Sequence, residues 1–208
     1  MRLTLKTVFV ILVLLSTRAG AAQETTGEAL QDVVARLAAP DVLRGRFTQT
    51  RKIQLISRPL ESSGRFILSD MGLYWQQEQP LASVLIADGE RLLQQVDDGP
   101  LESVDVAKNP MVLTFSKSFL SIFEGNESEL RSNFDVALVS AADGWEIRLT
   151  PVTYPMAEAI NAIILRGRDY IEELNVTSRS LDETTIVFSD LQTLPDQLTE
   201  HEIELYAR

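Results

Sequence analysis

The sequence has no cysteine and a single histidine, His201. Without cysteine no disulfide can form, and zinc, copper and iron sites lose most of their usual ligands. A histidine-based triad would have to use His201, and no G-x-S-x-G elbow, glycine-rich phosphate loop or EF-hand spacing is present. We therefore expect no metal site, no cofactor and no catalytic centre, and we predict that the protein is not an enzyme.

The carboxylates leave one enzymatic alternative open. Two carboxylates about 5 to 9 Å apart are all that a glycosidase requires, and the chain has 30 acidic residues. Nearly all of them fall at expected turns or on polar strand faces, which favours a solvated surface. An esterase or glycosidase acting on envelope material nevertheless stays open as a hypothesis.

Long apolar runs are also scarce. Two basic residues precede the first run, at 8–15, and small residues follow at 19–22. This pattern is typical of a secretory signal peptide, and the run is shorter than the about 20 residues that a membrane-spanning helix needs. We expect residues 1–22 to be a signal peptide, cleaved after Ala21 or Ala22.

Basic residues are outnumbered by acidic ones. Removal of residues 1–22 takes away three of the 19 basic residues and none of the 30 acidic ones, which changes the formal charge from −11 to −14. A field of that sign repels phosphate backbones, so we expect no nucleic-acid partner. Residues 23–208 are long enough for a single domain with a sizeable core. We expect this domain to be a monomer, free in the compartment to which it is exported.

The mature chain is expected to begin with a helix. Leu30, Val33, Val34 and Leu37 form an apolar stripe. Thr25 or Thr26 is the expected N-cap, and Pro40 ends the segment.

From Leu43 onward short runs rich in Val, Ile, Phe and Thr alternate with turn residues. The clearest alternation is at 145–150, where the apolar residues Trp145, Ile147 and Leu149 are separated by polar ones. Such a pattern places one face of a strand in a core and the other in water. Tight turns with a positive φ are expected at four glycines: Gly89, Gly99, Gly144 and Gly167. The pattern predicts an antiparallel meander of about eleven or twelve strands.

A second helix is predicted at 110–125, with Asn109 as N-cap, Pro110 at the first position and Gly125 at the C-terminal end. It has more apolar residues than a narrow stripe needs: Val112, Leu113, Phe115, Phe119, Leu120, Ile122 and Phe123. Two interpretations stay open. The helix either plugs the sheet as ordinary core or, together with 30–37, forms a lid over a ligand cavity.

Several short motifs follow one another in a familiar order: Phe47-Thr48-Gln49, Gly64-Arg65-Phe66, Leu73-Tyr74-Trp75, Pro80, the segment 84–89 and later Leu149-Thr150-Pro151. In order and spacing they resemble the periplasmic outer-membrane lipoprotein carrier family, LolA.

The resemblance implies a mainly β (α+β) fold: an unclosed antiparallel half-barrel with short helices covering its concave apolar face. It also implies that the cavity takes acyl chains of a lipoprotein or other lipid from an inner-membrane transporter and passes them to an outer-membrane acceptor. By position, Leu73, Trp75, Leu85 and Leu113 would line the cavity. Strand alternation adds Phe47 and Phe66, and the predicted lid helix adds Phe115, Phe119, Ile122 and Phe123.

The chain departs from the family pattern in two places. Ser69-Asp70-Met71-Gly72 replaces the Arg-Pro pair whose arginine is thought to hold the lid, and Arg58-Pro59 lies too early to substitute for it. Leu92, Leu93 and Gln94 replace aromatic residues after the Asp-Gly turn. The resemblance therefore implies a divergent paralogue, whose cargo could be another acylated or polyene lipid. A periplasmic lipid- or lipoprotein-sensing regulatory domain of the same fold is the alternative hypothesis, and our expectation of a single domain at 23–208 speaks against it.

Overall fold

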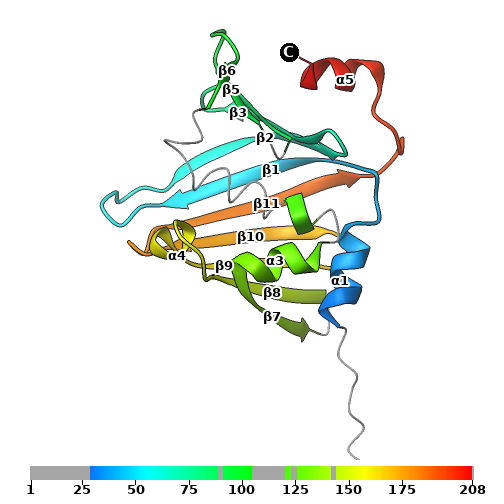
Figure 1. Ribbon diagram of the computed structural model, residues 1–208. Helices are drawn as coiled ribbons and strands as arrows, with labels where there is room; N and C mark the ends of the chain where they lie inside the picture. The colour runs from blue at the N-terminus through cyan, green and yellow to red at the C-terminus, as the bar shows by residue number, and fades with distance from the viewer. Residues whose placement is uncertain (1–28, 89–90, 105–119, 123–125, 142–143, 208) are drawn as a thin grey trace, which may run out of the picture.

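A computed structural model describes residues 29–88, 91–104, 120–122, 126–141 and 144–207. This part of the chain contains eleven strands in one antiparallel sheet, with the order β6-β5-β4-β3-β2-β1-β11-β10-β9-β8-β7 (Figure 1). The strands are β1 (Val42–Lys52), β2 (Leu60–Ser69), β3 (Gly72–Gln79), β4 (Ser83–Ala87), β5 (Leu92–Val96), β6 (Glu102–Ser103), β7 (Phe134–Ala141), β8 (Gly144–Pro151), β9 (Ile160–Gly167), β10 (Ile171–Ser178) and β11 (Glu183–Gln192).

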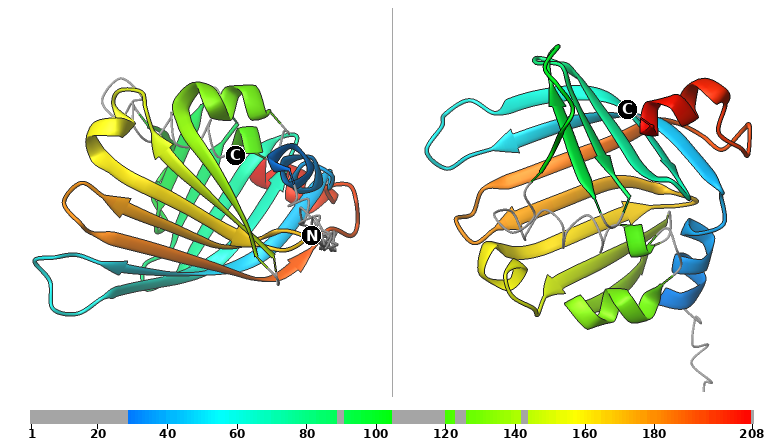
Figure 2. Two further views of the ribbon diagram at one scale, coloured as in Figure 1. Left: turned by 90° about the horizontal axis from the view of Figure 1, so that it is seen from below. Right: turned by 45° about the horizontal axis from the view of Figure 1, so that its top comes forward.

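The sheet bends but does not close, because β6 and β7 stand at its two edges and do not pair with each other (Figure 2). The described helices are α1 (Leu30–Leu37), α3 (Glu127–Asn133), α4 (Met156–Ala159) and α5 (Glu200–Tyr206), and residues 120–122 are also helical. The predicted fold class, a mainly β half-barrel with short helices, is confirmed.

The main core lies on the concave face of the sheet. Alternate residues of the strands point to this face, and they join α1, α3, α4 and residues 120–122 in one buried cluster. In β8 these residues are Trp145, Ile147 and Leu149, which are buried, while Arg148 between them is exposed. The alternation predicted for this strand is confirmed.

The convex face carries a second, smaller core. Val42, Ile67, Tyr74, Val84 and Ile86 pack there against Leu205 and Tyr206 of α5. The sequence had led us to expect that the short helices cover the concave face. This expectation is wrong for α5, which packs on the convex face. The C-terminal helix lies on the opposite side of the same strands (Figure 1).

The expected helix ends and glycine turns need corrections. The N-cap of α1 is Ala29, not Thr25 or Thr26. Gly144 has the predicted positive φ, at 148°, but Gly99 and Gly167 do not. In the turn that contains Gly99, Asp97 takes the left-handed conformation instead, with a φ of 49°. Gly167 is required for space instead, because a Cβ there would overlap the carbonyl oxygen of Tyr170.

Other predictions fall outside the described residues. These are the signal peptide, the turn at Gly89, and most of the helix predicted at 110–125. The described portion of that segment, 120–122, is helical and buried, which agrees with the prediction. No helix in the described part of the chain has the length and apolar character that a bilayer crossing requires.

Candidate functional site

Four aromatic rings from neighbouring strands meet on the concave face. The Phe47 ring in β1 stacks on Trp75 in β3, with 3.7 Å between ring centroids. Phe66 lies 6.2 Å from Trp75, and Phe188 of β11 packs edge-on against both, at 5.3 Å from Phe66 and 6.3 Å from Trp75. Stacked and edge-on contacts of this kind stabilise beyond the area that they bury. We call these four residues the aromatic cluster.

The aromatic cluster encloses little empty space. A cavity of about 10 Å³ lies beside it, lined by Leu43, Phe66, Leu68, Leu73, Trp75, Ile171 and Phe188. That volume is close to the minimum for one water molecule. In the described arrangement these side chains form a packed core, and an acyl chain could enter only if they separated.

The predicted site residues that the structure describes do come together. Phe47, Phe66, Leu73 and Ile122 are buried in the concave core, and Trp75 and Leu85 are partly buried against it. Leu113, Phe115, Phe119 and Phe123 lie outside the described residues. Sequence reasoning missed Leu43 and Phe188, although Phe188 alternates with Ile186 in β11 and could have been found by the same rule that found Phe66.

A larger open trough adjoins the aromatic cluster towards the β1–β2 turn. Its volume is about 1040 Å³, and it is lined by Thr48, Gln49, Arg51, Ile56, Arg58, Pro59, Leu60, Glu61, Ser62, Ser63, Gln77, Gln79 and Pro80. We call this set of residues the trough. The concave surface thus changes along its length, from an aromatic floor to a mixed polar and apolar one.

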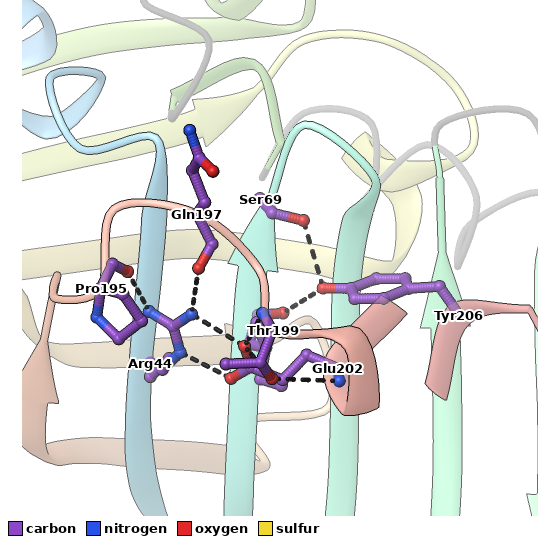
Figure 3. Close-up of polar contacts among 8 residues, drawn as sticks. Arg44, Ser69, Pro195, Gln197, Thr199, Glu202 and Tyr206 are labelled. Carbon is purple, nitrogen blue, oxygen red and sulfur yellow. Dashed lines mark hydrogen bonds and ion pairs between the residues drawn. The ribbon is translucent and has the colours of Figure 1, made fainter. Parts of the chain in front are cut away.

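The segment that replaces the family's Arg-Pro pair is the β2–β3 turn, and α5 holds it from the convex side. The one hydroxyl hydrogen of Tyr206 is shared between the carbonyl oxygens of Ile67 and Gly72, at 3.0 and 3.2 Å. The hydroxyl oxygen accepts from Ser69 Oγ at 3.5 Å (Figure 3). Burial raises the pKa of Tyr206 to about 12. Here a tyrosine fixes the turn, whereas the family pattern places an arginine in the turn itself.

Metal-ligating side chains and the single histidine were the remaining candidates for chemistry in the sequence. The described residues include no cluster of three or more His, Asp or Glu side chains that could hold a metal ion. His201 is exposed on α5, and its nearest carboxylate, that of Glu204, lies 4.0 Å away.

Three solved structures resemble the chain at low sequence identity. A domain from Vibrio parahaemolyticus, named for outer membrane lipoprotein sorting, is 10% identical with a TM-score of 0.50, over 86% of this chain and 96% of that one. A LolA superfamily protein from Nitrosomonas europaea is 8% identical with a TM-score of 0.48, over 82% and 95%. A DUF1329 family protein from Desulfovibrio piger is 9% identical with a TM-score of 0.49, over 82% and 93%.

The sequence comparisons give the family. No curated protein matches the chain. The family described as outer membrane lipoprotein carrier protein LolA matches residues 40–199, which is more than half of the sequence. The chain therefore belongs to the LolA family.

Proposed function

We propose that this protein is a periplasmic carrier that binds the acyl chains of a lipoprotein or another lipid on its concave face and takes them towards the outer membrane. Family membership supports a carrier of this general type. An inner-membrane transporter would be the donor, and an outer-membrane protein the acceptor. In this proposal the protein acts as a monomer and catalyses no reaction.

One observation carries the proposal: the concave face is apolar from β5 to β7, and in the described residues only short helices cover it. The helices have between four and eight residues each. Short helices are marginal by themselves and depend on their packing. Separating such helices from the sheet should cost less free energy than separating a second sheet would. Their separation would expose apolar surface to a ligand.

The energetics suit a carrier. Burying an acyl chain is worth about 0.8 kcal/mol per CH₂ group, so a chain of about sixteen carbons is stabilised by roughly 10 kcal/mol in either a membrane or an apolar protein cavity. Transfer between the two is then close to neutral. The donor and acceptor proteins would therefore have to supply the free energy that makes transfer run in one direction.

Because the aromatic cluster is packed, loading requires it to open. The stack of Phe47 on Trp75 is the contact that an acyl chain would have to part first. The acyl chain would replace the lost contacts between the rings with contacts of its own to the same rings. In this proposal, the packed arrangement therefore corresponds to the ligand-free protein.

The test is binding of a fluorescent fatty acid to the purified mature protein. Trp75→Glu and Leu85→Glu each place a charge on the concave face and should abolish binding, with circular dichroism confirming that the fold persists. Val187→Glu is the matched control, because Val187 is 47% exposed on the same sheet. Binding that survives both concave substitutions, or that Val187→Glu also abolishes, contradicts the proposal. Native mass spectrometry of protein from the periplasm would identify the cargo by its mass.

A further inference from the structure

The trough continues the concave face beyond the aromatic cluster. In β1, Phe47, Gln49 and Arg51 are two residues apart, so their side chains point to the same face. In β3, Trp75 and Gln77 are related in the same way. At about 3.3 Å per residue, Arg51 lies about 13 Å along the strand from Phe47. A single elongated molecule could therefore occupy both regions.

The trough contains two arginines that are free to bind a ligand. Most other arginines of the described chain are paired with carboxylates: Arg44, Arg46, Arg65, Arg91, Arg131, Arg166 and Arg168. Within the described residues, Arg51 and Arg58 have no such partner, and both are exposed in the trough. Acidic residues outnumber basic ones in this protein, so two unpaired cations in one depression are unexpected from composition alone.

The remaining residues of the trough fit the junction between a head group and an acyl chain. Ile56, Pro59, Leu60 and Pro80 supply apolar surface. Glu61 is the one carboxylate among the lining residues, which leaves a net positive charge. A guanidinium presents a planar fork of donors that matches the oxygens of a carboxylate or a phosphate.

We propose that the trough binds the anionic head group, a carboxylate or a phosphate, of the same molecule whose acyl chain occupies the concave face. This inference rests on the proposed carrier function and adds the chemical class of its ligand. Arg51 and Arg58 would bind the head group, while Pro59, Leu60 and Pro80 would contact the first methylene groups of the chain. The protein would thereby prefer anionic amphiphiles over neutral ones of the same length.

The experiment compares two probes that differ only in head-group charge: dansyl-undecanoic acid and its methyl ester. The intact mature protein should bind the acid about fivefold more tightly than the ester, the size expected for exposed ion pairs. Raising the salt concentration should reduce this preference. The double variant Arg51→Ala/Arg58→Ala should weaken binding of the acid about fivefold and leave the ester unaffected.

Arg148→Ala is the control. Arg148 is exposed on the opposite face of the sheet, and it too has no partner among the described residues. It should change the affinity for neither probe. Dodecanoate and dodecyl phosphate should both displace the bound acid better than dodecanol, and the stronger competitor identifies the preferred oxyanion.

Equal affinity of the wild type for acid and ester, or an equal loss in Arg148→Ala, overturns the head-group inference and leaves the carrier function standing. Failure of both probes to bind overturns the carrier function itself. Circular dichroism of the double variant should match the wild type, because both arginines are exposed and unpaired in the described structure.

Discussion

Arg44 in β1 and Glu202 in α5 form a two-point ion pair although they lie 158 positions apart in the sequence. Arg44 Nε lies 2.6 Å from Oε1 of Glu202, and Nη2 lies 2.8 Å from Oε2 (Figure 3). Arg44 also donates to the carbonyl oxygens of Pro195 and Gln197, at 2.7 and 2.9 Å. This one guanidinium therefore fixes both the helix and the segment that leads to it against the convex face.

The first prediction concerns pH. The hydrogen bond from Arg44, assisted by the backbone N–H of Thr199, lowers the pKa of Glu202 from 4.5 to about 2. A lowered carboxyl pKa stabilises the fold fully above pH 4.5, and this contribution disappears as the pH falls to about 2. Both side chains are mostly buried, so Glu202→Gln should lower the free energy of unfolding by about 2 to 3 kcal/mol at neutral pH.

Urea denaturation from pH 2 to pH 7 checks this prediction. The difference between the wild type and Glu202→Gln should shrink as the pH falls through the window between 4.5 and about 2. Glu204→Gln serves as the control, because that side chain lies on the same helix and is 78% exposed. A difference that does not depend on pH would show that the ion pair contributes nothing to acid stability.

Tyr206 gives a second, alkaline prediction. Burial raises its pKa from 10 to about 12, so its contribution to stability is complete below pH 10 and is lost as the pH rises through 12. Tyr206→Phe should cost about 1 to 2 kcal/mol at pH 7, because the carbonyl oxygens of Ile67 and Gly72 lose their hydroxyl donor. In Tyr206→Phe, the free energy of unfolding should also no longer show the part of its fall between pH 10 and pH 12 that comes from ionisation of Tyr206. Ultraviolet absorbance of tyrosinate and denaturation at high pH measure both effects, with exposed Tyr154→Phe as the control.

Gly64 is predicted to tolerate no side chain. A Cβ there would overlap the backbone carbonyl oxygen of Gln76 in β3, and backbone cannot move away without disturbing the sheet. Gly64→Ala should destabilise the fold by at least about 2 kcal/mol. At Gly99 the nearest atom to an added Cβ, the Val96 carbonyl oxygen, is 3.0 Å away, so Gly99→Ala should cost less than about 1 kcal/mol. Similar melting temperatures for the two variants would contradict this difference.

The strands were predictable where one face is apolar and the other polar, as in β8. Composition alone does not distinguish helix from strand for β9, because its residues are apolar at most positions and both structures can bury such a run. Ile163 and Leu165 are buried and Ile164 between them is partly exposed, so the strand alternates in burial though not in composition.

The convex core was missed even though two signals were present. Ile67 lies between Phe66 and Leu68, so β2 is apolar on both faces and needs a cover on each. Thr199 and Glu202 have the spacing of a capping box, and the structure contains both of its hydrogen bonds.

The size of the cavity beside the aromatic cluster could not be predicted. It depends on how the four aromatic side chains pack against one another, and the periodicity of the sequence does not determine that packing.

The last prediction uses the two tryptophans as reporters. Trp145 is buried in β8, where its Nε1 donates to the carbonyl oxygen of Arg168 at 2.7 Å, and Trp75 stacks on Phe47. Trp145→Phe leaves Trp75 as the only tryptophan of the chain. Because an acyl chain must part the stack, adding palmitate to this variant should shift the emission of Trp75. Trp75→Phe, which keeps Trp145, should show a much smaller response. If palmitate binds by an independent measure while Trp75 emission stays constant, the ligand lies elsewhere and the aromatic cluster is only core.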